Sequence, residues 1–330
     1  MTCATNPRMT SAMETLMTVP NRRMTWRESA RLLLALLMGV LVITGARAAA
    51  PAQRSFATPD DAVSALVQAV KAGDRNAMLA ALGNAGEWLS SGDATADKLA
   101  AARFLSDYEE KHTMVRDGGK ATLTIGSEDF PFAFPLVTSG EQWRFDTASG
   151  KEELLARRIG GNELSTIKIL QAIVDAEQEY ASEDRAGDGV LAYAQRIASR
   201  PGKRDGLYWP AKAGEPESPL GVLAAQAAGE GYKQSDKPPT PYHGYLYRML
   251  KGQGKSAESG AFDYVVRGRG IAGFAVVAYP AKYGNSGIMT FIVNQDGRIY
   301  QADLGPETKA KAEGMQRFDP GKGWAAVDAK

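Results

Sequence analysis

The chain has 330 residues, with 39 Lys and Arg against 38 Asp and Glu and a formal net charge of +1. That length predicts about two domains, each large enough to bury its own core. The 44% hydrophobic and 23% charged content is typical of a globular protein and argues against disordered, collagenous and coiled-coil chains. The balanced charge argues against a nucleic-acid partner. One cysteine excludes a disulfide scaffold, and two histidines leave little for a metal centre, so we expect no metal site and no cofactor.

Residues 1–48 are expected to be a signal peptide. Arg27 and Arg31 precede the apolar run 32–45, and Ala46-Arg47-Ala48 follows as an A-x-A cleavage site. A membrane-spanning helix needs about 20 apolar residues, so an uncleaved anchor is the weaker alternative. We therefore expect no stable membrane span after the signal has been cleaved.

The start of the chain is open to a second interpretation. Met24 stands just before the signal, so residues 1–23 are also consistent with a misassigned start. Cleavage after Ala48 would remove Cys3, the only cysteine, which suits an oxidising compartment. We expect a soluble bacterial protein that is periplasmic or secreted.

Residues 56–147 are predicted to form an N-terminal α+β domain. Thr58-Pro59-Asp60-Asp61 has the features of a helix start, with a capping Thr, an early Pro and two acids. Further helices are expected over 74–82 and 97–112, because apolar residues recur there at helical spacing. Three short β runs then follow, at 121–125, 132–138 and 141–145. Helices followed by a meander predict helices on one face of an antiparallel sheet.

Residues 151–305 are predicted to form a second α+β domain, with a long helix packed on an antiparallel sheet. The helix is expected over 151–180, with a break at Gly160-Gly161. Five β runs follow, at 245–250, 262–266, 273–279, 288–294 and 298–304. Asp296-Gly297 suits a tight hairpin between the last two. Residues 306–330 are expected to be a polar tail.

The richest aromatic–polar cluster follows a long loop that is rich in Gly and Pro. Its members are Tyr242, His243, Tyr245, Tyr247 and Arg248. Prolines before it make the segment stiff, and Tyr and Arg are enriched at binding hot spots, so we predict a binding surface for a partner or ligand. Because histidine changes charge near neutral pH, binding there is expected to depend on pH. The alternative is a structural role in which the tyrosines pack at the edge of the sheet.

Tyr283 and Ser286 are included in this candidate site. Ser286 lies in Gly284-Asn285-Ser286-Gly287, one residue short of a G-x-S-x-G elbow and in a hairpin loop. A nucleophilic serine needs a base, and only His112 and His243 are available. Catalysis by Ser286 with His243 is therefore the weaker alternative, and no residue is assigned as catalytic.

The segment 268–273 matches G-x-G-x-x-G after a predicted strand. A dinucleotide site requires its third glycine to open a helix whose N-terminus binds the pyrophosphate. Here Gly273 opens the strand Phe274-Ala275-Val276-Val277. A glycine-rich hairpin turn is the favoured interpretation.

Four motifs resemble an exported bacterial family, the one known as domain of unknown function 2950. They are Gly140-Glu141-Gln142-Trp143-Arg144-Phe145-Asp146, Arg157-Arg158-Ile159-Gly160-Gly161-Asn162-Glu163-Leu164, Pro239-Thr240-Pro241-Tyr242-His243-Gly244-Tyr245 and Met289-Thr290-Phe291-Ile292-Val293-Asn294-Gln295-Asp296-Gly297. The likeness covers about 56–304 and implies no catalytic residues, since the family has no established activity. The C-terminal half, from Asn162-Glu163 through the long helix to its closing strands, also resembles pilin-like α+β domains.

We favour an exported, soluble envelope protein without catalytic activity, which binds another exported protein or a cell-surface polymer. No complete catalytic or cofactor motif occurs in the sequence, and the resemblance to pilin-like domains agrees with a binding role. The alternative is a periplasmic small-molecule-binding or hydrolytic enzyme with a site near His243 and Ser286. The sequence leaves open whether a reaction is catalysed.

Overall fold

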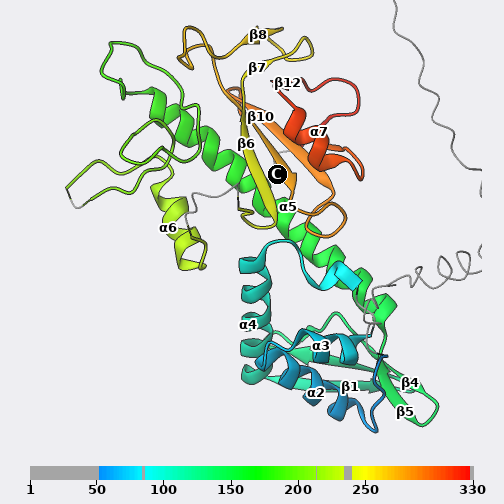
Figure 1. Ribbon diagram of the computed structural model, residues 1–330. Coiled ribbons are helices and arrows are strands. Elements are labelled where there is room, and N and C mark those ends of the chain that lie inside the picture. The colour runs from blue at the N-terminus through cyan, green and yellow to red at the C-terminus, as the bar shows by residue number, and fades with distance from the viewer. Residues whose placement is uncertain (1–51, 84–85, 213, 234–239, 328–330) are drawn as a thin grey trace, which may run out of the picture. The chain divides into compact units, whose positions relative to one another are not determined.

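The computed structural model describes residues 52–83, 86–212, 214–233 and 240–327. The predicted signal peptide lies outside these residues. Ala50–Lys330 form one compact unit, and its division into two domains stays a prediction. Helices precede an antiparallel sheet twice along the chain (Figure 1), so the predicted α+β class is confirmed. Within the described part of the chain, no helix combines the length and apolarity needed to cross a membrane.

The first helices begin where their capping residues stand. They are α2 (Pro59–Lys71), α3 (Arg75–Leu82), the 3-10 helix η1 (Gly86–Leu89) and α4 (Ala94–Glu110). Thr58 and Asp61 form a reciprocal capping box at α2, as the sequence indicated. Helix α4 starts three residues earlier than predicted because Asp93 accepts hydrogen bonds from the backbone N–H groups of Thr95 and Ala96.

The first sheet follows these helices. Its strands are β1 (His112–Asp117), β2 (Lys120–Ile125), β3 (Phe130–Pro131), β4 (Leu136–Ser139) and β5 (Gln142–Phe145). They pair antiparallel in the order β1-β2-β4-β5, with β3 on β2. Strand β1 was not predicted, because five of its six residues are exposed and it lacks the alternation that marks a half-buried strand.

Helix α5 (Thr147–Ala181) runs without interruption through Gly160-Gly161, so the predicted break is wrong. Glycine disfavours a helix by about 1 kcal/mol relative to alanine, which tertiary packing can override. Leu154 and Leu155 of α5 pack against the first hydrophobic core, and Leu170 belongs to the second. The two cores therefore pack on the same helix, the first before Gly160-Gly161 and the second after it.

The second half of the chain has ten shorter elements. They are α6 (Gly221–Gly229), β6 (Tyr245–Leu250), β7 (Gly252–Gln253), β8 (Phe262–Asp263), β9 (Ala275–Pro280), β10 (Met289–Asn294), β11 (Tyr300–Asp303), α7 (Thr308–Gly314), β12 (Arg317–Phe318) and β13 (Ala325–Ala326). The main sheet is antiparallel in the order β13-β11-β10-β9-β6, and a small sheet has the order β12-β7-β8. The β run predicted at 262–266 is shorter, because Val266 already begins a hairpin turn.

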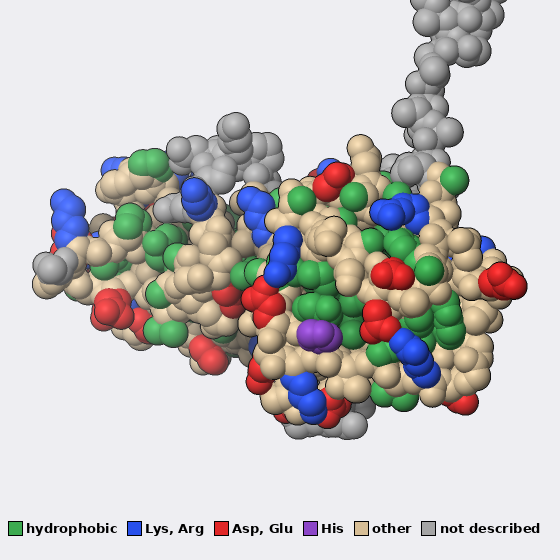
Figure 2. Space-filling model, turned by 90° about the horizontal axis from the view of Figure 1, so that it is seen from below, with side chains coloured by type: hydrophobic (Ala, Val, Ile, Leu, Met, Phe, Trp, Pro, Cys, Tyr) green, Lys and Arg blue, Asp and Glu red, His purple; other side chains and the backbone are tan. Residues whose placement is uncertain are grey.

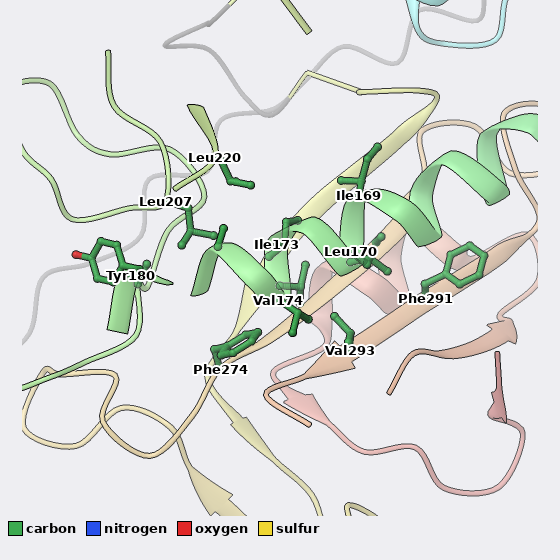
Figure 3. Close-up of a cluster of buried hydrophobic side chains, with 14 of the residues drawn as sticks. Ile169, Leu170, Ile173, Val174, Tyr180, Leu207, Leu220, Phe274, Phe291 and Val293 are labelled. Carbon is green, nitrogen blue, oxygen red and sulfur yellow. The ribbon is translucent and has the colours of Figure 1, made fainter. Parts of the chain in front are cut away.

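The two faces of the main sheet are covered by different parts of the chain. Val276 and Phe291 point to α5, where they meet Leu170, Ile173 and Val174; Figure 3 shows Phe291 among the side chains of this helix. Alternate residues of β9 and β10 face a third core, which also contains Ala312 of α7 and Phe318. Phe318 and Trp324, from the segment expected to be a polar tail, pack into this core.

Candidate functional site

Four side chains from two segments of the chain meet at the turn before β6. They are Glu230, Tyr232, Tyr242 and His243, which we call the Tyr–His cluster. The ring centroids of Tyr242 and His243 are 4.3 Å apart, and those of Tyr232 and Tyr242 are 4.8 Å apart, both in edge-on geometry. Such edge-to-face contacts stabilise a fixed arrangement of aromatic rings.

The turn holds His243 in an unusual backbone conformation. Tyr242 and Tyr245 exchange backbone hydrogen bonds of 2.9 and 3.1 Å, which leaves His243 and Gly244 as the two turn residues. Their φ angles are +49° and +75°. Left-handed φ at both positions is the type I′ pattern, which favours Asn, Asp or Gly. A histidine there is strained, but its ring is held at a defined place.

His243 faces a carboxylate. The distance from its Nε2 to Oε2 of Glu230 is 3.2 Å, and the two side chains are 28% and 25% exposed. Burial, followed by the charge of Glu230, raises the pKa of Tyr242 to about 12, so its phenol keeps its proton at neutral pH. The Tyr242 hydroxyl and Oε2 of Glu230 are shielded from solvent, and the Glu230 carboxylate interacts with both the imidazole of His243 and the phenol of Tyr242.

Asp93 connects this cluster to the start of α4. The hydroxyl of Tyr232 donates to Oδ2 of Asp93 at 2.8 Å, and the backbone N–H of Gly244 donates to the same oxygen at 3.0 Å. Burial, and then the hydrogen bond to Asp93, raises the pKa of Tyr232. The hydroxyl also accepts from the backbone N–H of His243 at 3.3 Å. Asp93, which is only 2% exposed, thus holds the strained turn in place.

Two other predicted site residues, Tyr245 and Tyr247, belong to β6. Tyr245 is fully buried, and its hydroxyl donates to the carbonyl oxygen of Met289 at 2.9 Å. Tyr247 is half-buried, its hydroxyl lies 3.3 Å from Oγ1 of Thr166, and burial raises its pKa. Both tyrosines therefore pack the sheet against α5, in the structural role that the sequence left as an alternative.

Arg248 and Tyr283 bind other elements. The guanidinium of Arg248 donates to the carbonyl oxygens of Ala312 and Met315, at the C-terminal end of α7. Such a cation satisfies the free carbonyls of a helix end and is favoured by the helix dipole. Tyr283 donates to Asp303 at 3.0 Å on the surface. The hydrogen bonds of Arg248 and Tyr283 therefore connect them to other parts of the fold than the Tyr–His cluster.

Ser286 is a turn residue. Its side chain is fully buried, its Oγ accepts from the backbone N–H of Lys282 at 2.9 Å, and it donates to the carbonyl of Lys282 at 3.2 Å. Helix α5 holds this turn, because Asn162 donates to the carbonyl oxygen of Ser286 and Glu163 accepts from the backbone N–H of Met289. The hydroxyl is committed to its own turn, which leaves it poorly placed to act as a nucleophile.

Three residues of the site had weak sequence signals. The sequence around Asp93 indicates only a helix cap, and Asp93 is indeed the N-cap of α4. Glu230 and Tyr232 follow α6 in a segment without periodicity, so nothing local indicated that they would meet Tyr242 and His243. Only the three-dimensional contacts reveal them.

Charged side chains of both signs are intermingled on the face of the molecule that Figure 2 shows, with hydrophobic side chains between them. This face therefore has no extended field of one sign that would steer a polyanion to it. Among the residues that the structure describes, no group of three or more His, Cys, Asp or Glu could hold a metal ion.

The family model described as Protein of unknown function (DUF2950) matches residues 53–327, so the chain belongs to this family. No curated protein and no solved structure matches the chain. The resemblance to pilin-like domains is not confirmed.

Proposed function

We propose that the protein is a non-catalytic binding module, exported to the bacterial envelope, whose Tyr–His cluster contacts another exported protein or a surface polymer. The observation that supports this most directly is the strained backbone of His243, whose imidazole is held 3.2 Å from the carboxylate of Glu230.

The left-handed backbone of His243 opposes folding. Asn or Gly in place of His243 would suit the turn better. Strain of this kind gathers at functional sites, where binding offsets it. The partly exposed edges of His243 and Glu230 are the part of the cluster that a partner can reach.

A second candidate function is acid–base catalysis, favoured by the 3.2 Å between Nε2 of His243 and Oε2 of Glu230. A carboxylate that orients an imidazole is a common arrangement in enzymes. The two functions differ in the effect of Glu230→Gln. In an enzyme this variant slows turnover while the substrate still binds, whereas in a binding module it weakens capture itself.

The experiment compares partner capture by variants of the full-length protein, tagged and purified from the envelope fraction. His243→Asn suits the turn and removes the imidazole, and Glu230→Gln removes the charge. His112→Gln is the matched control, because His112 also stacks on a tyrosine, Tyr108, at 4.0 Å.

We expect the first two variants to lose the co-purifying partner and the control to keep it, with little change in melting temperature. Equal capture by all variants would contradict the proposal.

A further inference from the structure

Nine large hydrophobic side chains are exposed within the described residues, and four of them lie on two neighbouring loops. Val190 and Leu191 are 40% and 58% exposed, and Val266 and Ile271 are 41% and 46% exposed. We call these four residues, together with Arg267, the aliphatic platform. Scattered exposed hydrophobic residues are ordinary, but a group of them on adjacent loops marks a candidate interaction site.

The two loops are fixed to one another by hydrogen bonds. The backbone N–H of Tyr193 donates to the carbonyl of Gly270 at 2.8 Å, and the side chain of Gln195 donates to the carbonyl of Gly268 at 2.9 Å. Arg269 donates to the carbonyl of Val190 at 3.1 Å and forms an ion pair with Asp188. The aliphatic side chains therefore project from a preorganised backbone, which lowers the entropic cost of binding.

Arg267 is not explained by the turn that it occupies. Val266 and Arg269 exchange backbone hydrogen bonds of 2.8 and 3.0 Å, so Arg267 and Gly268 are the central residues of a tight turn, with φ of +50° and +80°. Asn, Asp or Gly fits the first of these positions with less strain. Arg267 is exposed, and it makes no hydrogen bond or ion pair with any described residue.

The charges around the platform identify the complementary partner. Asp188 is neutralised by Arg269, and the carboxylate of Asp184 accepts backbone hydrogen bonds from Gly187 and Gly189. Of the two arginines on these loops, Arg269 is paired with Asp188, and Arg267 is the one that makes no ion pair with a described residue. Arginine beside apolar side chains is a frequent binding hot spot. An anionic lipid surface fits less well, because it favours clusters of several Lys and Arg, and these loops carry Asp184 and Asp188 beside their two arginines.

We infer that the aliphatic platform is a docking surface for a protein segment that presents apolar side chains beside a carboxylate. It shares no residue with the Tyr–His cluster.

The test uses the full-length protein and pairs of short synthetic peptides. One peptide of each pair carries Glu between Leu and Val residues, and the other carries Lys in place of Glu. Arg267→Asn removes the charge and suits the turn. Leu191→Ser combined with Ile271→Ser removes aliphatic surface. Val222→Ser is the matched control, because Val222 is 80% exposed on α6, outside the platform.

We expect the Glu peptides to bind at least about tenfold more tightly than the Lys peptides, a difference of about 1.4 kcal/mol. Arg267→Asn should abolish that preference, and the double Ser variant should weaken binding of both peptides about tenfold. Val222→Ser should have no effect. Equal binding of the two peptides, no binding, or insensitivity to the platform variants would overturn the inference. So would platform-dependent binding of phosphatidylglycerol vesicles, or platform-dependent self-association, in place of peptide binding.

Discussion

The hydroxyl of Tyr232 donates a hydrogen bond of 2.8 Å to Asp93, a residue 139 positions earlier in the sequence. Asp93 is at the same time the N-cap of α4 and the acceptor for the backbone N–H of Gly244. One buried carboxylate therefore connects the start of a helix, the segment after α6 and the strained turn of the Tyr–His cluster.

Tyr232→Phe should lower the free energy of unfolding by about 1–3 kcal/mol, because it removes a hydrogen bond from a buried carboxylate. Urea unfolding followed by circular dichroism measures the change. Tyr283→Phe is the matched control, since Tyr283 makes the same kind of bond to Asp303 at the surface, where water can replace it. Equal midpoints for Tyr232→Phe and the wild type would show that the bond does not hold the turn.

Glu177 predicts a pH dependence of stability. Its side chain is fully buried, Oε2 accepts from the backbone N–H of Ala194 at 2.8 Å, and Oε1 has no partner among the described residues. Burial raises its pKa from 4.5 to about 8. Between these values the folded protein keeps a proton that the unfolded chain has released, so stability should fall as pH rises through this interval.

Glu177→Gln should remove this slope, because glutamine does not ionise. Melting temperatures of the variant and the wild type are measured from about pH 5 to about pH 8. As pH rises, the melting temperature of the variant should therefore increase relative to that of the wild type. Glu179→Gln, an exposed neighbour on α5, is the control and should follow the wild type. A parallel pH dependence for Glu177→Gln and the wild type would contradict the burial of a protonated carboxyl.

Glycines of α5 should respond to alanine in opposite ways. An added Cβ at Gly160 or Gly161 would meet no atom within 4 Å, so each alanine should stabilise the helix by up to about 1 kcal/mol. At Gly150 the added Cβ would overlap the ring of Phe134, so Gly150→Ala should destabilise the protein. Urea midpoints of the three variants test this. Destabilisation by Gly160→Ala would indicate that α5 needs a bend there.

Local sequence signals located the element boundaries that depend on local chemistry. The capping box at Thr58 and Asp61 was predicted and is present, and Gly297 has the positive φ, +73°, expected of a tight turn. The continuity of α5 could not be predicted in the same way. It depends on two cores that lie at different places along one helix, and tertiary packing of that kind overrides the local propensity of glycine.

The candidate site was predictable only in part. Tyr242 and His243 are neighbours in sequence, and the prolines before them indicated a stiff turn, so their proximity could be expected. Their partners Glu230 and Asp93 come from other segments, and no spacing rule connects them to His243. Conversely, Tyr245 and Arg248 follow the same turn in sequence, but strand alternation and the end of α7 give them structural roles.

The central claim is that the exposed edge of His243 and Glu230 binds a partner. The most direct measurement is the affinity of the captured partner for the wild type, for His243→Asn with Glu230→Gln, and for His112→Gln, with a melting curve for each. The double variant should lose at least about tenfold in affinity, or about 1.4 kcal/mol, at an almost unchanged melting temperature, while the control should keep the affinity and melting temperature of the wild type. Full affinity in the double variant, or a loss of affinity matched by a large fall in melting temperature, would contradict it.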